Sequence, residues 1–175
     1  MREVTYGGAV SLDGFLAGVD GAIDWLHFSK DVQQAMAEYW RGVDTILMGR
    51  KTWEFAASQG NWPGRATRTV VFSRTLREIP DSQVELVKED AAEFVQNLKQ
   101  QPGGEICLMG GGELARSLLA DGLVDRVRLN IHPVLLGAGI PAFRDAGQRV
   151  RLSLEKCSEI EGGCLLAYYE VIHAK

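Results

Sequence analysis

Short apolar runs and helical repeats take turns along the first two thirds of the chain. The runs at 4–10, 45–48, 69–72, 84–87 and 105–109 have the length and composition of buried strands. Between them, apolar side chains recur every three or four residues, which is the period of an amphipathic helix. Strands that alternate with helices predict an α/β protein whose sheet is mostly parallel.

The helical segments carry start signals that place them along the chain. Ser29 is a suitable N-cap for the clearest helix, and Asp90 with Glu93 forms a capping signature for another. The apolar face of the clearest helix comprises Val32, Ala35, Met36, Tyr39 and Trp40. Shorter helical stretches are expected at 53–57 and 114–119, so that each lies between two predicted strands.

The C-terminal third follows a different pattern. A strand at 125–132 is followed by two more, at 152–158 and 164–171, and the turn residues Glu161-Gly162-Gly163 separate the last two. Two strands joined by a glycine-rich turn predict a hairpin. We therefore expect a single domain over residues 1–175, with a mostly parallel sheet that ends in an antiparallel edge.

Composition and charge indicate which kinds of molecule the protein is expected to bind. The 175 residues carry 19 basic and 23 acidic side chains, a mild acidity that disfavours binding to nucleic acid. Three cysteines without a C-x-x-C spacing suggest neither disulfides nor a zinc site, and we expect no metal and a cytoplasmic location. The longest uncharged stretch, 129–143, contains two prolines and two glycines, so we expect no membrane span. Its length also suggests burial against a second copy, as in a homodimer.

Glycines concentrate where one predicted strand ends. Gly110, Gly111 and Gly112 follow the strand at 105–109 and precede a helix. Consecutive glycines let the backbone approach a pyrophosphate, while the N-terminus of the next helix offers N–H groups and a positive dipole end. The segment therefore suggests a dinucleotide site, although a tight strand-to-helix turn would also require glycine.

Cations follow two other predicted strands. Gly49-Arg50-Lys51-Thr52 combines a glycine, two positive charges and a hydroxyl that suit a phosphate, or else an ordinary helix start. Ser73-Arg74 lies in the stretch 55–77, which holds four arginines and no acidic residue. These arginines are Arg65, Arg68, Arg74 and Arg77. A 2′-phosphate on adenosine ribose would suit this stretch, which favours NADP over NAD, and a solvated basic loop is the alternative.

Four motifs, each at the end of a predicted strand, together carry a family resemblance. They are Ser11-Leu12-Asp13-Gly14, Met48-Gly49-Arg50-Lys51-Thr52-Trp53-Glu54, Val71-Phe72-Ser73-Arg74 and Met109-Gly110-Gly111-Gly112-Glu113-Leu114. In this order they resemble the dihydrofolate reductase superfamily. The Ser-Leu-Asp-Gly opening and the segment 132–141 are similar to the C-terminal reductase domain of the bifunctional riboflavin-biosynthesis deaminase-reductase. The resemblance extends over residues 3–172.

The resemblance implies a three-layer α/β fold, with a central sheet of about eight strands between helices, and NADPH as cofactor. It places the cofactor phosphates and adenosine at Gly49, Arg50, Lys51, Thr52, Ser73 and Arg74. It places the pyrophosphate and nicotinamide at Met109, Gly110, Gly111, Gly112, Glu113 and Leu114, with Ala9, Val10 and Leu16 beside the nicotinamide. The loop at 11–25 would close over the site as a lid.

Few side chains are candidates for the chemistry itself. Hydride transfer to an imine or hemiaminal carbon needs a nearby proton, for which Asp13 and Asp31 are the candidate carboxylates. Asp13 also suits a turn, and Asp31 a helix dipole. Trp25 and His132 are candidate substrate contacts, and Trp62 could add to a flat wall, although core packing explains such residues equally well.

Two features separate the chain from its better-known relatives. Asp24-Trp25 stands where a dihydrofolate reductase has Pro-Trp, and the chain has no zinc deaminase motif. The resemblance therefore implies an NADPH-dependent reductase of a small heterocycle or aminopyrimidine riboside, similar to 5-amino-6-(5-phosphoribosylamino)uracil reductase. Reduction of dihydrofolate, or a nucleotide-binding module without turnover, are the alternatives.

Overall fold

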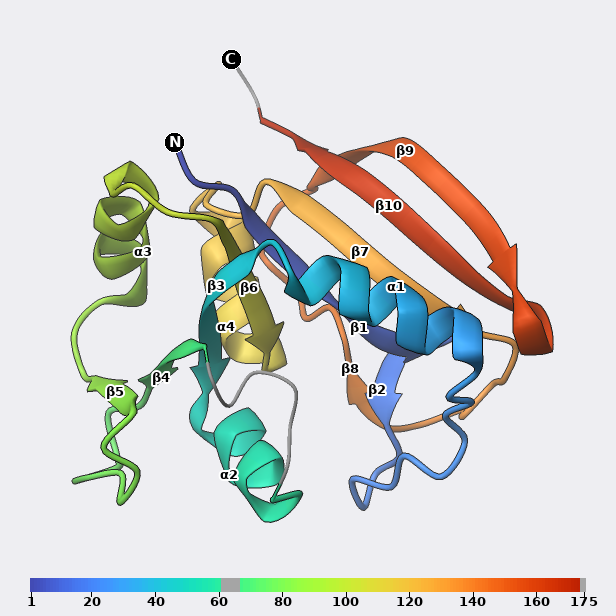
Figure 1. The fold of residues 1–175 in the computed structure, drawn as a ribbon, viewed down its shortest axis with the longest axis horizontal. Coiled ribbons are helices and arrows are strands. Elements are labelled where there is room, and N and C mark those ends of the chain that lie inside the picture. The colour runs from blue at the N-terminus through green and yellow to red at the C-terminus, as the bar shows by residue number, and fades with distance from the viewer. Residues whose placement is uncertain (61–66, 174–175) are drawn as a thin grey trace.

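The structure is a computed structural model that describes residues 1–60 and 67–173 (Figure 1). Arg65 and Trp62, which the sequence placed in the basic stretch and the aromatic wall, lie outside the described residues.

The described residues form an eight-stranded central sheet in the order β5-β4-β3-β6-β1-β7-β10-β9. Its strands are β1 (Val4–Ser11), β3 (Val43–Gly49), β4 (Arg68–Phe72), β5 (Val84–Val87), β6 (Glu105–Gly110), β7 (Arg126–His132), β9 (Arg151–Ile160) and β10 (Cys164–Ile172). Every pairing from β5 to β7 is parallel, and β10 runs antiparallel to both of its neighbours. The predicted parallel sheet with an antiparallel C-terminal edge is confirmed.

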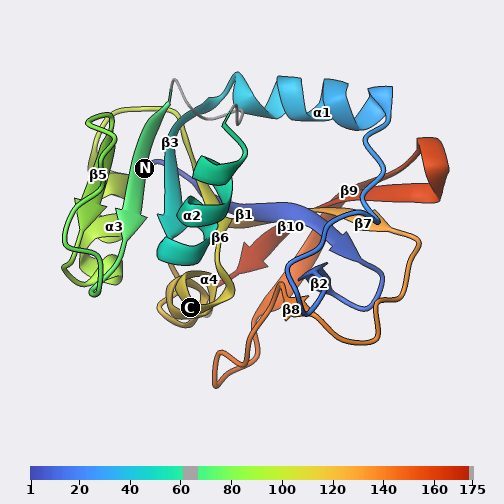
Figure 2. The same ribbon diagram turned by 90° about the horizontal axis from the view of Figure 1, so that it is seen from below.

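Helices cover both faces of this sheet (Figure 2). They are α1 (Lys30–Trp40), α2 (Arg50–Ser58), α3 (Ala91–Gln100) and α4 (Gly112–Ala120). The predicted caps are present, because Ser29 accepts a hydrogen bond from the Val32 N–H and Asp90 accepts two from the start of α3. Within the described ranges, no helix is long and apolar enough to cross a membrane.

Two apolar cores, one on each face, result from the alternation of side chains along the strands. Leu47 and Val70 point to the face of α3 and α4, where Leu118 is completely buried. Ile46 and Met48, their neighbours along β3, point to the face of α1 and α2. The central strands are therefore apolar on both sides, as their uninterrupted apolar runs indicated.

A short ribbon forms where the sequence suggested only loop. β2 (Phe15–Ala17) pairs antiparallel with β8 (Ile140–Pro141), and the register shifts within this pair. A side chain on Gly139 would collide with the carbonyl oxygen of Ala17, so the two backbones approach as closely as glycine allows. The ribbon ties the first part of the expected lid to the loop after β7. Helix α2 also begins earlier than expected, at Arg50 instead of Trp53.

Gly7 and Gly8 of β1 provide a matched pair for testing how tightly the sheet packs. A Cβ on Gly7 would overlap the carbonyl oxygen of Arg128, whereas a Cβ on Gly8 would lie 3.7 Å from Leu16 Cδ2. Gly7→Ala should lower the free energy of unfolding by about 1–3 kcal/mol, because β7 must shift. Gly8→Ala should change it by less than about 1 kcal/mol. Urea denaturation of the two variants checks this, and equal effects would contradict it.

Candidate functional site

The parallel strands bring the sequence-predicted residues to one edge of the sheet. Ser73, Gly49, Gly110, Ser11 and His132 end or follow the strands β4, β3, β6, β1 and β7, which are consecutive in the sheet. Ligands in α/β sheets bind at the carboxyl ends of strands. We call this the carboxyl edge, and Figure 1 shows α2 and β2 beside it.

Glycines let two helix starts approach each other at this edge. A Cβ on Gly49 would lie 3.4 Å from the Gly111 nitrogen, and a Cβ on Gly111 would lie 3.3 Å from Thr52 Oγ1. Gly110 has a φ of +119°, which disfavours any other residue, and the Gly110–Gly111 peptide is cis. Gly49 and Gly111 are the N-caps of α2 and α4, so no N-cap side chain covers either first turn. Two such helix starts suit an anion. We call Gly49, Thr52 and Gly110–Gly112 the glycine junction.

The charged residues beside the glycine junction differ in what they contact. Arg50 lies along its own helix, 2.8 Å from Glu54, and Lys51 is exposed. Glu113 accepts hydrogen bonds from Arg116 and Arg144, which hold the pKa of its carboxyl below the usual value. Glu113 therefore connects α4 to the segment after β8.

The predicted adenosine end is formed by only part of the basic stretch. Ser73 Oγ accepts hydrogen bonds from the N–H groups of Thr75 and Leu76, and it shapes the turn after β4. Arg74 is exposed on this turn. Arg68 instead begins β4 at the opposite edge, 2.8 Å from Glu85, because a five-residue strand separates it from Ser73. Its inclusion in an anion site was wrong.

The middle of β1 is open although β1 is a central strand. Gly8 is exposed and Ala9 half-buried, and Leu16 of β2 lies beside Gly8. Val10, by contrast, is 3% exposed, and Leu114 is packed in the core, so only their backbones could face a ligand. A flat group could therefore lie on β1 next to the glycine junction.

Asp13 fastens the turn after β1. Its Oδ1 accepts hydrogen bonds from Ser11 Oγ at 2.6 Å and Leu136 N at 3.2 Å, and its Oδ2 accepts one from Gly137 N at 2.8 Å. The Ser11 hydroxyl and these N–H groups lower the pKa of the carboxyl, although it is exposed to solvent. Asp31 lies farther along, at the start of α1, where its Oδ2 accepts a hydrogen bond from Glu161 N in the turn between β9 and β10. The two carboxylates therefore hold different loops.

Trp25 and His132 lie together, as side chains of one site would. Their rings meet edge to face with centroids 5.3 Å apart. His132 is 3% exposed, and its Nδ1 accepts a hydrogen bond from His27 N and lies 3.5 Å from Cys164 Sγ. Burial, with a smaller contribution from His27, lowers the pKa of His132. The imidazole is therefore a packed neutral ring.

The lowered pKa of His132 predicts how stability depends on pH. Above pH 6.5, the ordinary pKa of histidine, the ring is neutral in both the folded and the unfolded chain. Its contribution to the free energy of unfolding is then independent of pH. As the pH falls below 6.5, the unfolded chain binds a proton that the folded one resists, so stability decreases down to the folded pKa. His132→Gln should flatten the decrease in stability below about pH 6.5. Thermal melts across that range check this, and an unchanged slope would contradict it.

A row of polar side chains on β7 was not predicted from the sequence. Arg128 lies under α1, with its guanidinium 4.9 Å from the Tyr39 ring centroid and 3.4 Å from Glu105. In the part of the chain that the structure describes, three buried side-chain atoms have no hydrogen-bond partner: Trp25 Nε1, Arg128 Nε and Asn130 Oδ1. The signal was present, because every second residue from Arg126 to His132 is polar in a predicted strand. Native proteins rarely leave such atoms unpaired, so the row suits a polar ligand.

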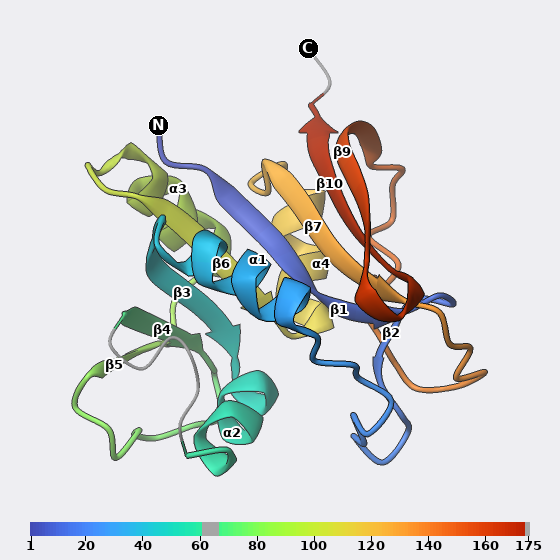
Figure 3. The same ribbon diagram turned by 45° about the vertical axis from the view of Figure 1, so that its right-hand side comes forward.

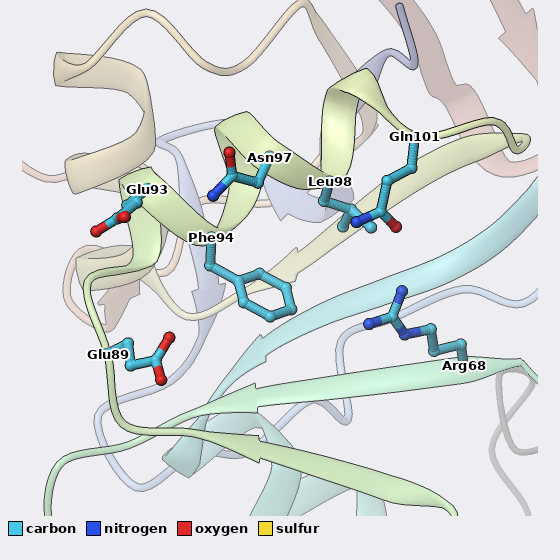
Figure 4. Close-up of a pocket in the computed structure, with 7 residues that line it drawn as sticks. All are labelled: Arg68, Glu89, Glu93, Phe94, Asn97, Leu98 and Gln101. Carbon is cyan, nitrogen blue, oxygen red and sulfur yellow. The ribbon is translucent and has the colours of Figure 1, made fainter.

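Two cavities lie outside the carboxyl edge. One of about 120 Å³ runs along α3, between Glu93, Phe94 and the guanidinium of Arg68 (Figure 4). The other, of about 320 Å³, is lined by Lys99, Asp125 and His173. Among the described residues, Arg68 is the one member of the predicted basic stretch that lines either of these two cavities.

The sheet order, the glycine junction and the helices on both faces define a reductase-like α/β fold. The family model of the RibD C-terminal domain matches residues 2–166, and the chain belongs to that family. It is 34% identical to the uncharacterized protein YyaP of Bacillus subtilis (strain 168), covering 96% of this chain and 94% of YyaP. YwjB of the same organism, also uncharacterized, is 32% identical over 91% of this chain and 93% of its own.

Solved structures extend this similarity. A Shewanella sp. PV-4 protein provisionally assigned to riboflavin biosynthesis has a TM-score of 0.87 and 26% identity, covering 99% of this chain and all of its own. The deaminase and 5-amino-6-(5-phosphoribosylamino)uracil reductase of Thermotoga maritima has a TM-score of 0.74 and 16% identity, covering 98% of this chain and 57% of its own. The predicted dihydrofolate reductase-like fold is thereby confirmed.

Proposed function

We propose that the protein is an NADPH-dependent reductase of a small heterocyclic substrate. The observation that carries this is the glycine junction, where two helix starts without N-cap side chains meet beside the open middle of β1. Membership of the RibD C-terminal family and the likeness in fold to the riboflavin-pathway reductase of Thermotoga maritima support a reductase. The nicotinamide would supply the hydride when bound.

The residues fit such a cofactor in one orientation. The glycine junction would bind the pyrophosphate through backbone N–H groups, with Lys51 nearby to neutralise charge. Ser73 and Arg74, at the end of the neighbouring strand, would bind the adenosine ribose and its 2′-phosphate. Gly8, Ala9 and Leu16 would form the wall against which the nicotinamide lies.

The two candidate carboxylates would then act in different ways. Asp13 has both oxygens occupied and a lowered pKa, so it would position the loops around the nicotinamide. Asp31 would deliver a proton from the start of α1, directly or through water. We also retain the homodimer as a proposal, since Leu135, Ile140 and Phe143 are 70%, 41% and 43% exposed.

Cofactor oxidation tests this function. Absorbance at 340 nm should fall when the protein is mixed with NADPH and a 5-amino-6-ribosylaminopyrimidine, and Asp31→Asn should lower kcat by about tenfold or more. Asp121→Asn, at the C-cap of α4, provides a control on the opposite edge. Oxidation with dihydrofolate alone would indicate a folate reductase. NADPH binding without oxidation of either substrate would indicate a nucleotide-binding module.

A further inference from the structure

The carboxyl edge has two halves of different charge. Around the glycine junction and β4 lie Arg50, Lys51, Arg74 and Arg77. Arg50 is paired with Glu54, and Glu113 is paired with Arg116 and Arg144, so cations outnumber carboxylates in this half. The other half, which we call the substrate half, comprises residues 11–31, 133–143 and 161–163. It carries five carboxylates and one lysine: Asp13, Asp20, Asp24, Asp31, Glu161 and Lys30. The rest of its surface is apolar or uncharged, including the whole segment 133–143.

Hydrogen bonds from two of these carboxylates connect the loops of the substrate half to one another. Asp13 binds the loop after β7, and Asp31 binds the turn between β9 and β10. Asp20 Oδ1 accepts a hydrogen bond from Ala22 N within its own turn. Asp24 follows Asp20 by four residues. Figure 3 shows the start of α1 beside the β9–β10 turn, where Asp31 and Glu161 meet. The substrate half therefore has an acidic rim.

Inside this rim, the groups offered to a ligand are uncharged or already paired. Trp25 Nε1 and Asn130 Oδ1 are a neutral donor and a neutral acceptor without partners. Arg128 lies four residues before His132 on β7, nearer the amino end of the sheet, and its guanidinium is paired with the Glu105 carboxylate, so it adds little net charge. These groups suit the hydrogen-bonding edge of a flat neutral molecule.

We propose that the substrate carries no phosphate and is a neutral planar heterocycle or its nucleoside. This inference rests on the proposed function and specifies its substrate class. A phosphate dianion in the substrate half would lie near several carboxylates, whose repulsion acts over about 8 Å at physiological ionic strength. The NADPH phosphates would not meet this repulsion, because they would bind at the cationic half. Rejection by like charge is a common source of specificity.

A matched pair of substrates tests this inference. A 5-amino-6-ribosylaminopyrimidine and its 5′-phosphate, each with saturating NADPH, should differ by at least about tenfold in kcat/KM in favour of the riboside. The difference should shrink at high salt, since screening weakens the repulsion. Asp20→Asn with Asp24→Asn should also narrow it, whereas Asp121→Asn, at the opposite edge, should not.

The outcomes separate this inference from the proposed function. Tryptophan fluorescence reports NADPH binding in the same samples, so a protein that fails to bind NADPH overturns the proposed function and the inference with it. If NADPH binds and the phosphate is preferred, or the riboside is preferred by less than about tenfold, only the inference is overturned. If NADPH binds and neither compound is bound or consumed, the proposed function and the inference are both overturned.

Discussion

Gly49→Ala should weaken NADPH binding by at least about tenfold, or roughly 1.4 kcal/mol, while the protein stays folded. The new methyl group would lie 3.4 Å from the Gly111 nitrogen and 3.9 Å from the Gly110 carbonyl oxygen, which are tolerable contacts in the free protein. Gly49 has an ordinary extended φ of −81°, so alanine adds no backbone strain. The methyl would nevertheless fill the space through which a pyrophosphate reaches the backbone N–H groups.

Gly42→Ala is the matched control for this variant. Gly42 precedes the same strand at its other end, and a Cβ there would lie 3.7 Å from the Tyr39 carbonyl oxygen. Calorimetric titration with NADPH should give the wild-type affinity for Gly42→Ala, and thermal melts should keep both variants within a few degrees of wild type. Equal NADPH affinities for the two variants would contradict the assignment of the glycine junction.

Asp125→Ala should destabilise the fold by about 3–5 kcal/mol. Asp125 Oδ2 accepts hydrogen bonds from Lys99 Nζ at 2.6 Å and from the Val4 N–H at 2.7 Å. The Lys99 side chain is only 7% exposed, and its other hydrogen bond goes to the Leu123 carbonyl oxygen. Without the carboxylate, a buried ammonium group would lose its counter-charge and β1 would lose a partner for its first N–H group. Urea denaturation measures the loss.

A double variant distinguishes this charge effect from loss of packing. Lys99→Met combined with Asp125→Leu removes both charges, so it should be more stable than Asp125→Ala alone by about 1–4 kcal/mol. If the double variant is as unstable as the single one, the buried charge is not the cause.

The sequence predicted the sheet well because its strands are buried on both faces. The short apolar run around Ile46 to Met48 is typical of a strand buried on both faces. The N-caps Ser29 and Asp90 indicated where two helices begin. The β2–β8 ribbon was missed because it depends on the close approach of Gly139 to Ala17, residues far apart in the chain. Local patterns contain no information about such a contact.

The candidate site was predictable only where it follows strand ends. Gly49, Ser73 and Gly110 could be grouped because parallel strands bring their ends together. Arg68 was assigned to the wrong edge of the sheet. It is close to Ser73 in sequence, but the whole length of β4 separates the two residues. Arg128 and Asn130 were not predicted, although polar and apolar residues alternate visibly along their strand. They stand out because each has a buried polar atom without a hydrogen-bond partner, which a sequence does not show.

Binding of NADPH and NADH tests the central claim, that the carboxyl edge holds a phosphorylated dinucleotide. Titration followed by tryptophan fluorescence should show NADPH bound at least about tenfold more tightly than NADH. Arg74→Ala should remove most of that preference and leave NADH affinity unchanged. Arg68→Ala, at the other end of the same strand, should preserve the preference. Equal affinities for the two nucleotides in the wild type, or binding of neither, would contradict the account.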